Sequence, residues 1–464
     1  MGRTVHFWCY IAVLILAPLP LGSNRPAFWT LLAILTGLLC LAWPLAASRD
    51  PARVSEPFGR LAAPLLLVSA VCGWALIQAV PGLPEVWTHP LWTAVRPELA
   101  DVSPRVAIDA DAARDGAMRL LLYAGIAYLA LQHGRSSRRA HRICDAIALS
   151  GGAYALYGLW SHFSGAQTIL GMAKWAYEDS LTSTFVNRNS YAAFAGLGLL
   201  CAFSACWRRL EATTPTDPRI LLHLRRPTML YVAAALLICA ALPATASRAG
   251  TAASLVAVVI LVLAGWCAIR ARRRLVPWLA LGAVPLLAGG ALVWILAWSE
   301  TGASMASDRL LVYGMTLDFV SQRPWLGHGL GSFPALFRMH RPLEAAQVWT
   351  EAHNSYLELA SDLGLPAAIA LIAAVLWLTV ICVLALIRGS SERETTALAV
   401  AATALIAIHA LVDFSAQIPA VTVTWMAILG CGVARAWRAL DARSTAPPER
   451  TSRLRRRRPT EGVA

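Results

Sequence analysis

Charged residues are scarce in this sequence. Only 14% of its 464 residues are Asp, Glu, Lys or Arg, whereas a soluble domain usually carries about 25%. Hydrophobic residues make up 58%. A soluble chain of this length would need several domains with polar surfaces, and no stretch is polar enough to supply one. The composition therefore excludes soluble, collagen-like and disordered proteins and leaves a polytopic membrane protein.

Paired cysteines and metal-binding motifs are also missing. All ten cysteines lie inside or at the edge of apolar runs, whereas a secreted disulfide framework places them in loops. The sequence contains neither C-x-x-C nor H-E-x-x-H. We therefore expect the cysteines to be packing residues, and we expect no metal and no cofactor.

What the sequence has instead is a series of long apolar runs. A bilayer core needs roughly 20 apolar residues per helix, and we predict an all-α protein with about twelve such spans. The predicted spans are residues 7–22, 27–47, 61–80, 117–133, 143–163, 189–207, 229–246, 249–269, 275–298, 365–387, 396–414 and 418–436. The first contains two prolines, but no small-residue cleavage site follows it, so we interpret it as a span and not as a signal peptide.

The distribution of arginine predicts the orientation. If both termini are cytoplasmic, most of the 40 Lys and Arg fall on the inside and most of the 26 Asp and Glu on the outside, as the positive-inside rule requires. We therefore predict a membrane domain over residues 1–436 and a basic, disordered cytoplasmic tail over residues 437–464. The basic turns suit anionic lipid headgroups, and no basic surface with interleaved aromatics indicates nucleic acid.

Three outer segments are long enough to carry function, and they are residues 81–116, 164–188 and 299–364. The third is the largest and most polar, and we expect it to be partly helical. Residues 307–320 predict an amphipathic helix with Arg309 near its start. The glycines within 323–333 permit a turn or a close approach to a ligand, and residues 351–364 predict a helix leading into the tenth span.

Several outer groups together suggest a transfer reaction. Arginine binds phosphate oxygens through two parallel donors, and an imidazole can take a proton near neutral pH. Arg188 and Arg248 stand at outer helix ends, and His353 lies near the outer surface. A base beside a cationic clamp suits transfer from a phosphorylated leaving group to a hydroxyl. The simpler alternatives are that Arg248 reaches headgroups and that the asparagines beside Arg188 cap a helix.

Two segments resemble the signature of the O-antigen ligase/polymerase superfamily. They are residues 323–333 (RPWLGHGLGSF) and 353–364 (HNSYLELASDLG). The family motif is His, then Asn, Ser or Gln, nine residues, Gly, two residues, and usually Gly, Thr or Tyr. His353, Asn354 and Gly364 match it, whereas Ala367 departs at the last position. Residues 182–191, 245–250 and 409–414 also resemble family segments, so the likeness spans roughly residues 115–435.

The resemblance implies a metal-independent inverting glycosyltransferase of the bacterial inner membrane that acts on the periplasmic face. Such enzymes move a saccharide from undecaprenyl pyrophosphate to an acceptor hydroxyl. By position, His353 is then the base that activates the acceptor, and Arg248 and Arg309 bind the donor pyrophosphate. Arg188 is a third candidate for this role.

The resemblance is less definite for the remaining candidates. The family arginine in the loop is often followed four residues later by Leu, whereas Tyr313 follows Arg309 here, so Arg323 competes for the same role. Asn189 and the neighbours of the histidine, which are Asn354, Tyr356 and Glu358, are candidates to orient the base or contact the sugar. Glu358 equally suits an exposed helix surface.

The alternatives concern both the acceptor and the class of protein. Within the family, a ligase passes glycan to the lipid A core, a polymerase extends a lipid-linked chain, and a protein O-oligosaccharyltransferase modifies serine. Outside it, twelve spans also suit a transporter or a lipid-linked sugar flippase, which would keep ionisable groups near the midplane. Only Asp145 and Asp413 come close to that position, which favours surface chemistry over transport. The sequence does not determine the oligomeric state.

Overall fold

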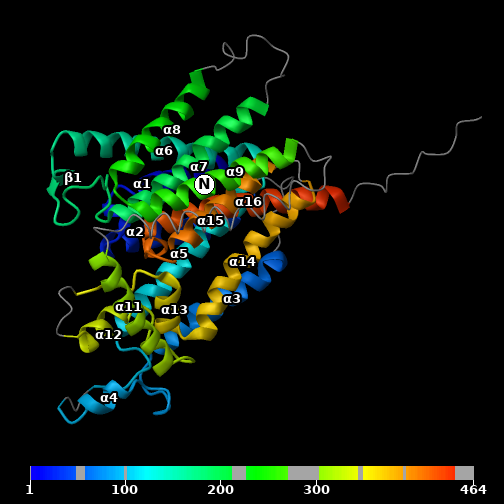
Figure 1. Cartoon of the computed structure of the whole chain (residues 1–464). Helices are drawn as coiled ribbons and strands as arrows, with labels where there is room; N and C mark the ends of the chain where they lie inside the picture. Colours follow the sequence, from blue (N-terminus) through cyan, green and yellow to red (C-terminus); the bar gives the residue numbers. More distant parts are fainter. Residues whose placement is uncertain are drawn as a thin grey trace, which may run out of the picture.

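The computed structural model describes residues 2–48, 58–98, 102–211, 226–269, 303–342, 348–389 and 393–444. These residues are predominantly helical with almost no strands (Figure 1), which confirms the predicted all-α class. The strands described there form one short antiparallel hairpin of β1 (Thr168–Ile169) and β2 (Met172–Ala173).

The described helices follow the predicted spans closely. They are α1 (Arg3–Leu16), α2 (Pro26–Ala47), α3 (Phe58–Gln78), α4 (Pro90–Val95), α5 (Ala110–Gly134), α6 (Ser137–Phe163), α7 (Arg188–Glu211), α8 (Arg226–Ala244), α9 (Arg248–Ile269), α11 (Ala303–Gln322), α12 (Phe333–His340), α13 (Ser355–Leu363), α14 (Leu365–Ile387), α15 (Arg393–His409) and α16 (Pro419–Ser444). Each predicted span overlaps one of them except the ninth, residues 275–298, which lies outside the described residues. Five of the described helices, α2, α3, α7, α14 and α16, are long and apolar enough to cross a membrane. The total of twelve spans stays a prediction.

The outer helices carry apolar side chains on their exposed surfaces. Leu41 of α2 is 77% exposed and Leu66 of α3 is 71% exposed, whereas α7 and α16 lie mostly buried at the centre. Helices that are hydrophobic all round and still exposed need an apolar solvent. The distribution of exposure therefore supports a membrane-embedded bundle.

Small residues allow the central helices to approach each other closely. A side chain at Gly430 of α16 would overlap the carbonyl of Ala127 on α5, and one at Gly152 of α6 would overlap Ala234 on α8. Close packing of small residues is typical of helix association in membranes, where there is no hydrophobic driving force between helices. The first contact joins α16 to α5 and the second joins α6 to α8, and both pairs of helices pack against each other in the bundle (Figure 1).

An ion network joins the predicted cytoplasmic ends of three helices. Arg208 of α7 bridges Asp145 of α6 and Glu394 of α15, and its Nη1 lies 2.9 Å from the Glu394 carboxylate. Asp145, which stood out in the sequence as a charge near a span, is therefore part of this network.

At the same end, α16 continues to Ser444, so residues 437–444 of the predicted tail are helical. The rest of the tail lies outside the described residues.

The opposite helix ends are joined by hydrogen bonds between distant segments. The Thr184 hydroxyl donates to the Pro18 carbonyl (2.8 Å), the Leu181 amide donates to Ala244 (3.0 Å), and the Ser355 amide donates to Ala410 (2.9 Å). The helices α11, α12 and α13 gather on this side (Figure 1). Because these bonds connect the ends of many helices, side chains from widely separated segments converge here.

Candidate functional site

A polar cavity of about 540 Å³ lies among these joined ends. Its walls come from the start of α7, the start of α11, the loop before α13 and the connection between α15 and α16. The lining residues used below are Tyr177, Arg188, Asn189, Arg309, Glu351 and His353. The cavity therefore brings together four sequence-predicted residues that lie up to 165 positions apart.

His353 sits between two aromatic rings in this cavity. Its ring centroid lies 4.9 Å from that of Trp349 and 5.0 Å from that of Phe414, with both contacts edge to face. The Nδ1 atom is 3.6 Å from the Asp413 carboxylate, and the side chain is 13% exposed. Since the two ring nitrogens face different directions, the contact of Nδ1 with Asp413 leaves Nε2 as the nitrogen suited to a substrate proton.

Asp413, the partner of the imidazole, lies in the connection between α15 and α16 and belongs to neither helix. It is 1% exposed, and its carboxylate accepts hydrogen bonds from the Asn189 side chain (2.7 Å) and the Ser415 hydroxyl (2.6 Å). Burial favours its neutral form, but contacts with His353, His409 and Ser415 outweigh burial and lower its pKa to about 2. Asp413 is therefore an ionised partner for His353.

The sequence showed Asp413 only as a charge near the end of a span. The signal that could have revealed its role is its place in the segment 409–414, which resembles the family. Asn189, predicted as a substrate-binding residue, lines the cavity and also donates a hydrogen bond to Asp413. The cap of α7 is Asn187, whose side-chain oxygen accepts from the backbone amides of Asn189 (2.7 Å) and Ser190 (3.2 Å).

Two arginines line the same cavity. Arg188 packs its guanidinium over the Tyr177 ring at 5.3 Å and donates to the Ser180 hydroxyl (3.1 Å), while its buried Nε has no partner among the described residues. Arg309 reaches the cavity from α11. The cavity thus presents two guanidinium groups on walls shared with an imidazole. Guanidinium groups are well suited to bind the oxygens of an anion such as a phosphate.

The other two predicted arginines are not among the described residues that line this cavity. Arg248 begins α9 and is exposed at the same end of the bundle, but it is not among the described lining residues. Arg323 lies elsewhere, because its guanidinium donates to the carbonyls of Gly327 (3.0 Å), Thr88 (2.9 Å) and Trp87 (2.6 Å). The prediction that Arg323 competes with Arg309 for substrate therefore lacks support, since backbone carbonyls already use its donors.

Asn354 and Tyr356 also have structural partners. Asn354 is the N-cap of α13, and its side chain accepts from the amides of Tyr356 and Leu357, both at 3.1 Å. The Tyr356 hydroxyl donates to the Ala407 carbonyl at 2.9 Å. Neither residue is among the described residues that line the polar cavity, whereas Tyr356 lines a second, apolar groove described below.

Two glutamates flank the histidine. Glu351 lines the cavity, and burial raises the pKa of its carboxyl. Glu358 is 5% exposed, and its carboxyl accepts from the Ala352 amide at 2.7 Å, so its alternative interpretation as an exposed helix residue is wrong. Burial raises the pKa of Glu358 to about 8. The Glu358 carboxyl therefore favours the neutral form near neutral pH, which reduces its repulsion of an anionic substrate.

The glycines before α12 allow one part of the backbone to pack closely against another. Gly327 has a φ of 67°, and a Cβ there would overlap the carbonyl of Asp362. The Gln78 side chain donates to the Asp362 carbonyl (3.0 Å) and accepts from the Leu330 amide (3.1 Å). These contacts clamp the glycine segment onto α13. The predicted close approach is therefore to backbone and not to a ligand.

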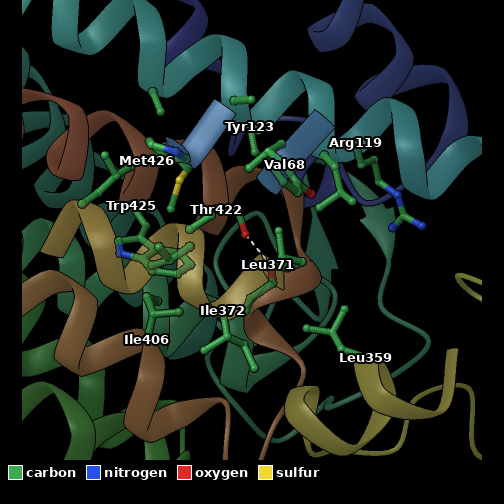
Figure 2. Close-up of a pocket in the computed structure, with 18 of the residues that line it drawn as sticks. Val68, Arg119, Tyr123, Leu359, Leu371, Ile372, Ile406, Thr422, Trp425 and Met426 are labelled. Atoms are coloured by element: carbon green, nitrogen blue, oxygen red, sulfur yellow. Dashed lines mark hydrogen bonds between the residues drawn. The ribbon is translucent and has the colours of Figure 1, made fainter. Parts of the chain in front are cut away.

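A second, apolar groove lies on the other side of the loop that carries His353. It has a volume of about 310 Å³ and is bounded by α3, α5, α13, α14, α15 and α16. Figure 2 shows Val68, Leu371, Ile406 and Trp425 around it, with Arg119 at the edge of the group. Ser355 and Gln417 line the groove, whereas their near neighbours His353 and Ile418 line the polar cavity. The same two segments therefore separate the groove from the cavity.

Metal ligands do not cluster in the described residues. No group of three or more His, Cys, Asp and Glu side chains there is placed to hold a metal ion. The groups available at the polar cavity are a histidine, its carboxylate partner and two guanidinium groups.

Comparison with known proteins gives one result. Residues 233–372 match the family described as O-antigen ligase. This segment includes Arg248, Arg309 and His353, but it ends before Asp413 and begins after Arg188. No curated protein matches the chain. The match confirms the predicted resemblance to the O-antigen ligase/polymerase superfamily over residues 233–372.

Proposed function

We propose that this protein transfers a glycan from an undecaprenyl pyrophosphate carrier to an acceptor hydroxyl during surface polysaccharide synthesis. The family match supports a glycosyltransferase of the O-antigen ligase or polymerase type. The observation that carries the proposal is the polar cavity lined by His353, Arg188 and Arg309, with the buried Asp413 in contact with the imidazole. We further propose that this cavity faces the periplasm.

In the proposed reaction, His353 acts as the general base. Its Nε2 takes the proton of the acceptor hydroxyl as that oxygen forms a bond to the anomeric carbon of the donor sugar. Asp413 stabilises the imidazolium that results and holds the ring orientation, as carboxylates do in other base–carboxylate pairs. Attack from the face opposite the leaving group inverts the anomeric centre.

The arginines act on the leaving group. As the bond between the anomeric carbon and the phosphate oxygen breaks, its electron pair stays on the pyrophosphate. Arg188 and Arg309 then stabilise the developing negative charge with donors that are already in place. Arg248, exposed at the same end of the bundle, is proposed as a third contact that meets the pyrophosphate at the rim.

The apolar groove supports a lipid-linked donor. A groove of apolar walls beside the polar cavity suits a polyprenyl chain, because a long apolar chain gains free energy by leaving water and by contacting packed side chains. Arg119 at its edge offers a positive charge near the level where a lipid phosphate would lie. We propose that the chain occupies the groove while the pyrophosphate enters the cavity.

The test is transfer by the purified protein from a lipid-linked donor. Wild-type protein should release undecaprenyl pyrophosphate and form a glycosylated acceptor, and His353→Ala should abolish both while remaining inserted and folded. Supplying a lipid A core, a second lipid-linked chain and a serine peptide in parallel separates ligase, polymerase and protein transferase. Undiminished transfer by the His353→Ala protein would exclude the proposed base.

A further inference from the structure

The backbone of His353 has an unusual conformation. Its φ is 52°, in the left-handed region that residues other than glycine seldom adopt. Such conformations persist only where surrounding contacts hold them, and they cluster at functional sites. Since the imidazole direction depends on this backbone, the contacts that hold residue 353 decide where its Nε2 points.

Contacts from three directions hold this stretch. The Ala352 amide donates to Glu358 (2.7 Å), and Ser355 is fixed on its other side by the Ala410 and Asp413 carbonyls at 2.9 and 3.0 Å. The carbonyl of His353 itself accepts a hydrogen bond from the Tyr313 hydroxyl at 3.0 Å. Tyr313 is therefore the partner that acts directly on the peptide unit of the histidine.

Tyr313 lies on α11, one helical turn after Arg309. Residues four positions apart lie on the same helix face, so Arg309 faces the cavity while Tyr313 reaches the histidine backbone beside it. Tyr313 is half-buried and is not among the described residues that line the cavity. Its hydroxyl is thus placed to act on the histidine and not on the substrate.

We propose that Tyr313 is a positioning residue, which ties the backbone of the catalytic histidine to the helix that carries Arg309. The proposal rests on the proposed function, because it takes His353 as the base.

The decisive variant is Tyr313→Phe, which removes one oxygen and keeps the ring. A net hydrogen bond contributes about 0.5–1.5 kcal/mol, and this converts to about a 2- to 12-fold change; misplacing a reacting group can cost on the order of 100-fold. We expect kcat for transfer by the purified full-length protein to fall by about 10-fold or more. The KM for the lipid-linked donor should stay within about twofold, because Arg309 keeps its place on α11.

A matched control separates positioning from general destabilisation. Tyr154→Phe removes a bond of the same kind, a phenol hydroxyl donating to the Ile15 carbonyl at 2.8 Å, from a position that does not line the cavity. Its kcat should equal that of the wild type. Tyr313→Leu also lacks the hydroxyl and should show the same loss of kcat. It provides the measurement if the Tyr313→Phe protein is poorly folded.

The outcomes distinguish this proposal from the proposed function. A loss of kcat in both Tyr313 variants, with donor KM and melting temperature near those of wild type, supports it. Unchanged kcat in a folded Tyr313→Phe protein overturns it, while an inactive His353→Ala protein would leave the proposed function intact. Full activity of His353→Ala would instead reject the proposed function and this inference together.

Discussion

Replacing Asp413 by asparagine tests the electrostatic design of the site. The substitution removes one negative charge 3.6 Å from His353 Nδ1 and nearly preserves the side-chain shape. If the imidazole becomes positive in the transition state, two unit charges at this distance interact by about 4–5 kcal/mol at an effective dielectric constant of about 20. Asp413 is 1% exposed, so solvent screens this interaction little.

The expected effect of Asp413→Asn is a large loss of turnover. About 4 kcal/mol corresponds to roughly three orders of magnitude in rate, and we take this as the upper limit because the amide keeps some polar contacts. We expect kcat to fall between about 30-fold and 1000-fold. The assay is release of the lipid pyrophosphate from a purified lipid-linked donor, measured at saturating donor.

A control substitution of the same type should be silent. Asp441 pairs with Arg60 at 2.7 Å, but both side chains are well exposed, and exposed ion pairs contribute about 0–1 kcal/mol. Asp441→Asn should therefore keep wild-type turnover. If Asp413→Asn also keeps turnover within about twofold while folded, the carboxylate does not stabilise an imidazolium, and the proposed role of the pair fails.

Three further predictions test other parts of the molecule. Arg309→Lys keeps the charge but loses the forked donors, so kcat/KM should fall about 10-fold or more, whereas Arg338→Lys, at an exposed position of α12, should not change it. Ala407→Trp should fill the groove and raise KM for a full-length polyprenyl donor but not for a short-chain analogue, with Leu41→Trp on the exposed face of α2 as the control. Burial raises the pKa of Glu358 from 4.5 to about 8, so its contribution to stability is full below pH 4.5 and is lost as pH rises through 8. The melting temperature of the Glu358→Gln protein should therefore rise relative to that of the wild type as the pH increases from 5 to 8. A difference in melting temperature that does not change with pH would contradict this prediction.

The pH prediction depends on the groups around Glu358. The neighbouring Glu351 carboxyl raises its pKa further, while Arg119 and the Ala352 amide lower it. Asp362, also buried, has a raised pKa for the same reason, burial first and then Glu358. Measurements on an Asp362→Asn background would separate the two carboxyls.

Much of the helical framework could be predicted from local sequence. Apolar runs such as 365–387 have the length that a bilayer demands, and α14 has the same bounds. The helix predicted over 307–320 lies within α11, because its apolar positions recur with helical spacing. The helical residues 437–444 could not be predicted in this way, because their arginines suggested an exposed tail, whereas Arg438 donates to the Arg135 carbonyl.

The candidate site was only partly predictable. His353, Arg188 and Arg309 stood out because a base and cations carry recognisable chemistry, and all three line one cavity. Arg323 carries the same chemistry, yet its donors satisfy backbone carbonyls. No local pattern distinguishes a guanidinium that binds substrate from one that holds a loop, because the difference lies in what the fold places around it.

By itself, the sequence determined the class of protein, because hydrophobic run length and arginine distribution are local properties that the bilayer acts on directly. It also indicated His353 as the proposed base, through a short motif. Only the tertiary structure decided the partners. Asp413 meets Asn189 across 224 positions of the chain and His353 across 60, because the ends of α7 and α15 pack together, and pairings between such distant residues depend on how helices pack and not on their composition.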